Sequence, residues 1–274
     1  MTDKKKILIL GASGFLGGEL YRELHPYFDV YGTYHTPDKK LLKNQKFIEW
    51  DLEIDPIHYI LQDLKPDIII SCLKGNFAGQ VHVHERIAEF LLTHESKLIY
   101  VSSANVFDTF TNYPSYEYDK TLSGSVYGKS KIKIENALMR LPNALFTIVR
   151  LPMVFGYNSP KVKEIKLLYD LNEAIEVFPN VVINATTHQK FTQQIHYIIN
   201  RDLEGTYHLG SSDLIHHKEL IEEICDALQL EAPLFKNVYS SNRDRYIAVL
   251  PKFHNLPEHL TITIEDVIYN SVKI

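Results

Sequence analysis

The stretch Lys6-Ile-Leu-Ile-Leu-Gly-Ala-Ser-Gly-Phe-Leu-Gly-Gly-Glu-Leu20 decides how the rest of the chain is interpreted. Its first apolar residues, Ile7 to Leu10, do not alternate with polar ones, which is typical of a strand buried on both faces. Glycines follow at positions 11, 14 and 17, and an apolar helical stripe begins at Phe15. A strand that turns through glycines into a helix is typical of a phosphate-binding loop, because the helix N-terminus presents free N–H groups to an anion.

Each glycine has its own expected role in this loop. Gly11 permits a tight turn, Gly14 lets the backbone approach a pyrophosphate, and Gly17 lets the helix pack closely on the strand. The spacing is G-x-x-G-x-x-G rather than the more common G-x-G-x-x-G, and glycines also serve ordinary turns. Because the triplet lies directly between a strand and a helix, we predict a dinucleotide site here. The expected contacts are Gly11, Ser13, Gly14, Phe15, Leu16 and Gly17.

Composition narrows the class of protein. The chain has 274 residues, 45% of them hydrophobic, which is enough for a sizeable core. It has no apolar run of about 18 residues and no signal-peptide pattern at its N-terminus. The two cysteines, Cys72 and Cys225, fit no metal motif, and the net charge of −5 argues against a nucleic-acid partner. We therefore expect a soluble cytoplasmic α/β protein with a small-molecule ligand and with neither a membrane nor a nucleic-acid partner.

Strand patterns and helix patterns alternate from residue 7 to residue 149. The expected strands are 7–10, 29–34, 47–50, 66–71, 98–101 and 145–149, and the expected helices are 17–24, 57–64, 81–93 and 127–140. This alternation predicts a Rossmann-type, doubly wound parallel sheet. We expect residues 1–156 to form the dinucleotide-binding domain. Residues 157–274, where the pattern loosens, are expected to form a smaller C-terminal substrate lobe whose strands can interleave with the sheet.

The ends of the expected strands supply further cofactor contacts. The second strand ends at Thr33 and His35 without the carboxylate that reads a ribose 2′-hydroxyl, and Lys39 and Lys40 follow. This favours NADP, with NAD also considered. Asp51, after the third strand, either binds an adenine amino group or caps the helix that follows Pro56. The remaining expected contacts are Leu52 and, where the fourth strand ends beside the glycine loop, Cys72, Leu73 and Lys74.

A second constellation consists of Ser102-Ser103, Tyr127 and Lys131. Residues four apart share a helix face, so the Lys131 ammonium can lie near the Tyr127 ring. A nearby cation favours the phenolate and lowers a tyrosine pKa from its usual value near 10. Tyr127 can then exchange a proton with a carbonyl, while a serine hydroxyl just past the fifth strand polarises the same oxygen. These are the parts needed for hydride transfer to a ketone.

The spacing Y-x-x-x-K is not specific by itself. It also matches Tyr116/Lys120, Tyr157/Lys161 and Tyr269/Lys273, so some matches are accidental. Only Tyr127 both opens a strong helix and follows a Ser-Ser strand end by one long loop, residues 108–126. The alternative for Tyr127 and Lys131 is an ordinary surface pair.

Four segments together resemble the extended short-chain dehydrogenase/reductase family. They are Gly11-x-x-Gly14-x-x-Gly17, Val101-Ser-Ser-Ala-Asn-Val-Phe-Asp108, Tyr127-Gly-Lys-Ser-Lys131 and Arg150-Leu-Pro-Met-Val-Phe-Gly156. The resemblance is greatest to its dTDP-4-dehydrorhamnose reductase branch, which acts on nucleotide sugars. It implies that Ser103 is the catalytic Ser/Thr and Tyr127 the acid. Lys131 would bind the nicotinamide ribose and lower the tyrosine pKa, so Tyr127 and Lys131 also count as cofactor contacts.

The chain departs from that branch mainly at substrate positions. Ser103-Ala104-Asn105 replaces Thr-Asp-Tyr, Ser71-Cys-Leu-Lys-Gly75 replaces Asn-Ala-Ala-Ala-Tyr, and Thr186-Thr-His-Gln-Lys-Phe-Thr192 replaces a Pro-Thr segment. The resemblance therefore implies an NAD(P)-dependent reductase of a 4-keto nucleotide sugar or a related carbonyl, with a homodimer left open. The alternatives are a nucleotide-sugar epimerase and a non-catalytic, NADP-binding regulatory subunit like that of methionine adenosyltransferase.

Other chemistry-bearing residues carry weaker signals. His82, His84, His94 and the His216-His217 pair have no carboxylate or cysteine at ligand spacing, so we expect no metal site. Glu117 and Asp119, in the long loop, either face a substrate or are solvated.

Overall fold

The computed structural model describes residues 4–36, 43–109, 111–239 and 241–273. The chain forms two compact units, each assembled from three segments. The first unit comprises residues 1–102, 125–149 and 195–206, and the second comprises 103–124, 150–194 and 207–274. The expected division is at Gly156, into residues 1–156 and residues 157–274, with strands that can interleave.

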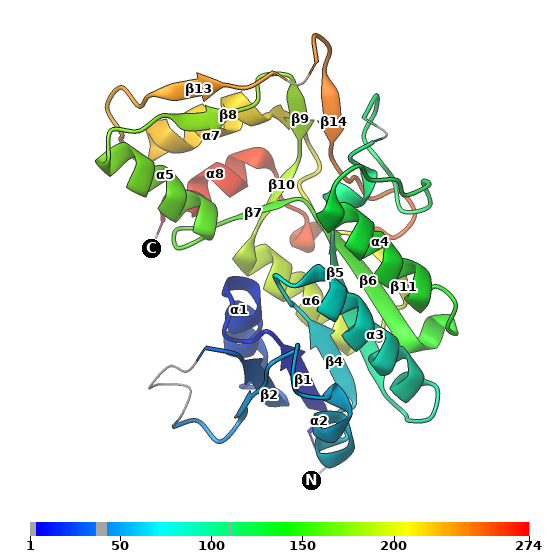
Figure 1. Cartoon of the computed structure of the whole chain (residues 1–274). Helices are drawn as coiled ribbons and strands as arrows, with labels where there is room; N and C mark the ends of the chain where they lie inside the picture. The colour runs from blue at the N-terminus through cyan, green and yellow to red at the C-terminus, as the bar shows by residue number, and fades with distance from the viewer. Residues whose placement is uncertain (1–3, 37–42, 110, 240, 274) are drawn as a thin grey trace. The chain divides into compact units, whose positions relative to one another are not determined.

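A seven-stranded sheet is the centre of the first unit (Figure 1). Its strand order is β11-β6-β5-β4-β1-β2-β3, and β1 pairs in parallel with both β2 and β4. The strands are β1 (Lys6–Leu10), β2 (Asp29–Tyr34), β3 (Phe47–Glu49), β4 (Ile68–Ser71), β5 (Lys97–Ser103), β6 (Phe146–Leu151) and β11 (Gly205–His208). The last residues of β5, β6 and β11 belong to the second unit.

Helices lie on both faces of this sheet because its strands are apolar on both faces. Leu8 and Leu10 of β1 join one core cluster with residues of α2 (Ile57–Leu64), α3 (Phe77–Leu91) and α4 (Val126–Leu138). The alternate residues, Ile7 and Ile9, are buried on the other face, and α1 (Phe15–Leu24) contacts β1 and β2. The predicted doubly wound α/β fold is confirmed.

The second unit has its own core and three small sheets. Its strands pair as β10-β7, β12-β9-β14 and β13-β8. Phe155, Ile183 and Ile224 are among the buried residues of its core cluster. The elements are the 3-10 helix η1 (Ala104–Phe107), β7 (Met153–Phe155), α5 (Pro160–Asp170), β8 (Ile175–Val177), β9 (Val181–Ile183), β10 (Ala185–Thr187), β12 (Ile215–His216), α7 (His217–Ala227), β13 (Phe235–Asn237), β14 (Arg245–Ile247), η3 (Glu258–Leu260) and α8 (Ile264–Val272).

Several element boundaries differ from the expected ones. The third helix starts at Phe77 instead of residue 81, because the Asn76 side chain accepts a hydrogen bond from the Gly79 N–H and caps it there. Helix α6 (His188–Arg201) runs through both units, and the 3-10 helix η2 (Asn143–Leu145) precedes β6. Among the described residues, no helix has the length and apolar character needed to cross a membrane.

Candidate active site

The glycine loop joins β1 to α1 with the backbone geometry that its sequence predicts. Gly11 has a φ of +79°, and its carbonyl accepts a hydrogen bond from the Gly14 N–H at 3.0 Å. A Cβ at Gly17 would overlap the Gly11 carbonyl, so the helix could not approach the strand so closely with any larger residue. Gly14 is the N-cap of α1 and has an extended conformation. A Cβ placed on Gly14 would lie 3.3 Å from the Gly11 carbonyl oxygen and near no other atom of the described residues. At Gly14 the loop therefore presents backbone rather than a side chain at the helix N-terminus.

A cavity of about 400 Å³ lies at this end of the sheet, within the first unit. Its wall is formed by the last residues of β2 and by loop residues after β1, β2, β3 and β4, which is where open parallel sheets bind ligands. The predicted contacts that line it are Gly11, Ser13, Gly14, Thr33, His35, Asp51, Leu52, Cys72, Leu73 and Lys74. Five predicted contacts do not line the cavity: Phe15, Leu16, Gly17, Tyr127 and Lys131. Four residues line it without having been predicted: Tyr34, Trp50, Glu53 and Asn76.

Polar contacts hold the cavity wall in place. The Gly11 N–H donates to Thr33 Oγ1 at 2.9 Å, so this hydroxyl ties the glycine loop to β2. Asp51 Oδ2 lies 3.2 Å from His35 Nε2, and Asp51 Oδ1 accepts from the Glu53 N–H at 2.8 Å. Asp51 does not cap a helix, because Pro56 occupies the N-cap of α2. Lys39 and Lys40 lie outside the described residues.

Helix α4 carries the tyrosine and the lysine of the second constellation. Ser125 caps it by accepting from the Gly128 N–H at 3.0 Å, which places Tyr127 in the first turn. Lys131 is 4% exposed, and its Nζ donates to the Val101 carbonyl at 3.1 Å. The same Nζ lies 5.7 Å from the centroid of the Tyr127 ring, which is 36% exposed. The pair thus has a buried cation behind a tyrosine that solvent reaches.

Burial changes the acid–base properties of the lysine. It lowers the pKa of Lys131 to about 8, because a charged ammonium is poorly solvated in the protein interior, while Cys72 and Glu135 act in the opposite direction. The Tyr100 ring, whose centroid is 4.9 Å from Nζ, forms another wall around the cation. A lysine with this pKa is mostly charged near neutral pH and favours the phenolate form of a neighbouring tyrosine.

The two serines at the end of β5 have different surroundings. Ser102 belongs to the first unit and donates to Glu135 Oε1 at 2.5 Å. Ser103 belongs to the second unit, is 8% exposed, and donates to Asn105 Oδ1 at 3.0 Å while accepting from the Asn105 N–H at 3.3 Å. The Ser102 hydroxyl therefore donates to a buried carboxylate and the Ser103 hydroxyl to a neighbouring amide oxygen, so Ser103 must turn away from Asn105 before it can polarise a carbonyl.

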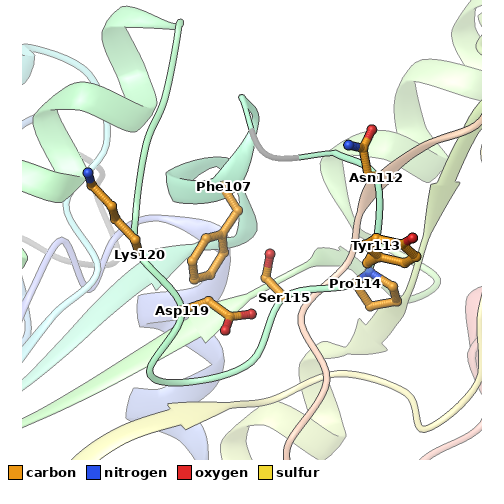
Figure 2. Close-up of a pocket in the computed structure, with 7 residues that line it drawn as sticks. All are labelled: Phe107, Asn112, Tyr113, Pro114, Ser115, Asp119 and Lys120. Carbon is orange, nitrogen blue, oxygen red and sulfur yellow. The ribbon is translucent and has the colours of Figure 1, made fainter.

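The second unit contains a separate cavity of about 350 Å³ in the loop after η1 (Figure 2). Its lining residues are Phe107, Asn112, Tyr113, Pro114, Ser115, Asp119 and Lys120. Asp119 Oδ2 accepts from the Tyr116 N–H at 2.7 Å and so supports a turn of the same loop.

Glu117 of this loop is not solvated. It is 2% exposed, and its carboxylate accepts hydrogen bonds from the backbone of Lys252 at 3.0 Å and from Phe253 and His254 at 3.3–3.4 Å. Burial raises the pKa of Glu117, but the backbone hydrogen bonds, of which the one from Lys252 has the largest effect, together lower it. Glu117 is therefore neither a substrate contact nor a solvated loop charge. Its carboxylate holds the backbone of residues 252–254 in place.

The histidines show no grouping suited to a metal. Among the described residues, no three His, Cys, Asp or Glu side chains come together as metal ligands. His84 is fully buried in α3, with its Nδ1–H donating to the Gln80 carbonyl at 2.6 Å and its Nε2 accepting from Ser71 Oγ at 2.8 Å. It is a satisfied core histidine.

Comparison with known proteins identifies relatives along nearly the whole chain. The bovine (Bos taurus) methionine adenosyltransferase 2 subunit beta is 24% identical over 264 residues, which cover 86% of this chain and 76% of that protein. The dTDP-4-dehydrorhamnose reductase of Yersinia enterocolitica is 20% identical with a TM-score of 0.77, covering 98% of this chain and 99% of the other.

Another solved structure with a similar fold contains NADP. It is the dTDP-4-dehydrorhamnose reductase of Bacillus anthracis, 24% identical with a TM-score of 0.69, covering 90% of this chain and 89% of the other. The model of the RmlD substrate-binding domain family matches residues 5–252. The predicted resemblance to this branch of the extended short-chain dehydrogenases/reductases is confirmed, and the chain belongs to the RmlD substrate-binding domain family.

Proposed function

We propose that this protein is an NADP(H)-dependent oxidoreductase that reduces a carbonyl group on a nucleotide-linked sugar. The observation that carries the proposal is the Tyr127–Lys131 pair: a buried cation 5.7 Å from the ring of a solvent-accessible tyrosine. An ordinary surface lysine would extend into water, because burying its charge costs free energy. The same unit contains the glycine loop and the cavity at the end of the sheet.

The residues present fit a dinucleotide. The backbone N–H groups at the start of α1 and the side-chain-free surface of Gly14 suit a pyrophosphate. The cavity bounded by Thr33, His35 and Asp51 suits the adenosine part, and its volume lies in the range of small-molecule sites. When bound, a reduced nicotinamide supplies a hydride. The NADP complex of the similar Bacillus anthracis reductase supports the choice of this cofactor.

The chain's own residues would handle the proton. The Tyr127 hydroxyl donates its proton to the carbonyl oxygen as the carbonyl carbon accepts the hydride, which leaves an alcohol and a tyrosinate. The Lys131 ammonium stabilises that tyrosinate, and water returns the proton afterwards. Ser103 Oγ, at the end of β5, is proposed to turn from Asn105 Oδ1 and donate its hydrogen bond to the developing oxyanion instead.

The second unit is proposed to bind the sugar part of the substrate. It includes most of residues 157–274, and the segment Thr186–Thr192 spans β10 and the start of α6 there. Because this segment replaces the Pro-Thr motif of the dTDP-4-dehydrorhamnose reductases, we propose a sugar other than dTDP-4-dehydrorhamnose.

A non-catalytic regulatory role is the second candidate. The similarity to methionine adenosyltransferase 2 subunit beta favours it, as do the replaced substrate residues. Both candidate functions predict cofactor binding, so binding does not distinguish them. Only the reductase candidate predicts turnover of a substrate.

The test measures NADPH oxidation with a panel of 4-keto nucleotide sugars, using the wild type beside Tyr127→Phe and Lys131→Met. The reductase proposal predicts turnover by the wild type and its loss in both variants. Tight cofactor binding with no reduction across the panel would support the regulatory candidate instead. Interconversion of sugars without net NADPH oxidation would indicate an epimerase.

A further inference from the structure

Glu135 is a buried carboxylate that the proposed proton transfer does not use. It is 1% exposed, lies one helical turn after Lys131 on α4, and accepts from Ser102 Oγ at 2.5 Å. Residues four apart on a helix share a face, so Glu135 and Lys131 face the same buried space. A carboxylate withdrawn from water costs free energy unless it is compensated by charge and hydrogen bonds.

We infer that Glu135 is a positioning residue for the proposed reaction: its carboxylate, held in place by Ser102, keeps the Lys131 ammonium charged beside the Tyr127 ring. The catalytic part of this inference, the role of Glu135 in the reaction, rests on the proposed function. The electrostatic part concerns residues of the first unit alone.

Three other groups around Lys131, namely Cys72, Tyr100 and His84, do not supply a negative charge at neutral pH. Burial raises the pKa of Cys72 to about 12 and raises that of Tyr100 well above its usual range, so both stay protonated. Burial lowers the pKa of His84 to about 4, so this imidazole stays neutral. The titratable groups that face Lys131 are Cys72 after β4, His84 of α3, Tyr100 of β5, and Tyr127 and Glu135 of α4.

Among the titratable groups that face Lys131, Glu135 is the carboxylate, and the direction of its effect on the pKa of Lys131 is known. It raises the pKa of Lys131 against the larger effect of burial, which lowers it to about 8. Cys72 raises the pKa of Lys131 only as a thiolate, and burial keeps this thiol protonated at neutral pH. Without the carboxylate, Lys131 would lose its proton at a lower pH, and the tyrosinate formed at Tyr127 would lose its neighbouring cation near neutral pH.

The first experiment follows the Lys131 amine without any reaction. The protein is labelled with ¹³Cε-lysine, the Lys131 signal is assigned with Lys131→Met, and its midpoint is measured by NMR titration. We expect Glu135→Gln, which retains an acceptor for Ser102, to lower the midpoint by about one pH unit. Glu85→Gln, on the exposed face of α3, is the matched control and should leave the midpoint unchanged. An equal midpoint in wild type and Glu135→Gln overturns the inference.

A second variant covers the case in which Glu135→Gln does not fold. Glu135→Asp keeps the charge but withdraws it by one methylene, so it should lower the Lys131 midpoint by a smaller amount. An unchanged midpoint in this variant would also overturn the inference.

The pH profile of turnover then connects the electrostatics to catalysis. In Glu135→Gln the alkaline limb of kcat should move to lower pH by the same amount as the Lys131 midpoint, while kcat at pH 6 stays near the wild-type value. A uniform loss of kcat at every pH would indicate a structural role and overturn the positioning role. If the wild type reduces nothing, the proposed function fails, and the NMR titration still decides whether Glu135 sets the charge of Lys131.

Discussion

Tyr127 is the residue at which the proposed chemistry can be removed with the smallest change. Tyr127→Phe keeps the ring, including its contact with Phe77 at 5.7 Å between centroids, and removes only the hydroxyl. We expect NADPH affinity to change little and turnover to fall by about 100-fold or more, the usual loss for a missing general acid. Calorimetric titration and steady-state kinetics measure the two effects separately.

Tyr269→Phe is a matched control for this change. Tyr269 lies on α8, four residues before Lys273 at the C-cap of that helix, and Lys273 Nζ donates to its hydroxyl at 2.7 Å. Because Tyr269 is 56% exposed, removing this hydroxyl should leave turnover unchanged. A Tyr127→Phe variant with wild-type turnover would exclude Tyr127 as the acid.

The comparison of these two pairs explains what sequence could and could not predict at single residues. The Y-x-x-x-K spacing is the same in both pairs, but the lysines differ in burial. Lys131 is 4% exposed, whereas Lys273 is exposed to solvent. Burial of a lysine depends on strands β4 and β5 packing against α4, and no local pattern encodes that. The residue types alone do not separate Ser102 from Ser103; the family resemblance singles out Ser103, and the bond from Ser102 to Glu135 gives the first serine a different role.

The loop between β1 and α1 gives a prediction at the scale of an element. Gly14 is an N-cap with φ −77° and ψ 171°, a conformation in which aspartate caps helices well. Gly14→Asp should therefore fold normally but weaken NADPH binding by about 100-fold or more, because its carboxylate would lie beside the pyrophosphate.

Gly14→Asn is the control, since it has nearly the same shape without the charge. Titration calorimetry on both variants, with circular dichroism to check folding, makes the comparison. Equal affinity for NADPH in Gly14→Asp and the wild type would place the cofactor elsewhere.

The end of β2 predicts which cofactor is preferred. Thr33 and His35 stand where NAD-specific sites have a carboxylate, so nothing on this strand end repels a 2′-phosphate. We expect NADPH to bind about tenfold or more tightly than NADH, the order of magnitude of one charge-assisted hydrogen bond. Dissociation constants measured for both cofactors under the same conditions test this, and tighter binding of NADH would contradict it.

Elements with a strong local pattern were predicted well, and those without one were missed. The buried strands and the rule that ligands bind at their carboxyl ends led to Cys72, Leu73 and Lys74. Asn76 also lines the cavity but was missed, because its helix was expected to begin at residue 81; the signal was an Asn three residues before a glycine. Strands β7 and β10 have three residues each and show no periodicity of their own.

The course of the chain through two units is a property of the whole molecule that local patterns do not contain. The segment 195–206 returns to the first unit through the second half of α6. Its place depends on pairing and packing between residues far apart in sequence, whereas hydrophobic periodicity describes only neighbours. The expected single division at Gly156 follows the weakening of that periodicity.

Buried neutral histidines connect the fold to pH. His84 is fully buried, and burial lowers its pKa to about 4; burial likewise lowers the pKa of His208 to about 3 and that of His217 to about 4. An unfolded histidine titrates near 6.5, so between these values the unfolded chain binds more protons than the folded one. The free energy of unfolding must therefore fall as the pH falls from 6.5 towards 4.

His84 alone should account for about 3 kcal/mol of this fall, the energetic equivalent of its change in pKa. His84→Gln, which cannot take up the proton, should show a shallower dependence of unfolding free energy on pH over this range, whatever its stability at pH 7. His82→Gln is the matched control, because His82 is exposed on the same helix and should leave the dependence unchanged. Urea denaturation at a series of pH values gives all three curves. If the wild-type and His84→Gln curves run parallel from pH 6.5 to pH 4, His84 accepts its proton in the folded state as readily as in the unfolded one.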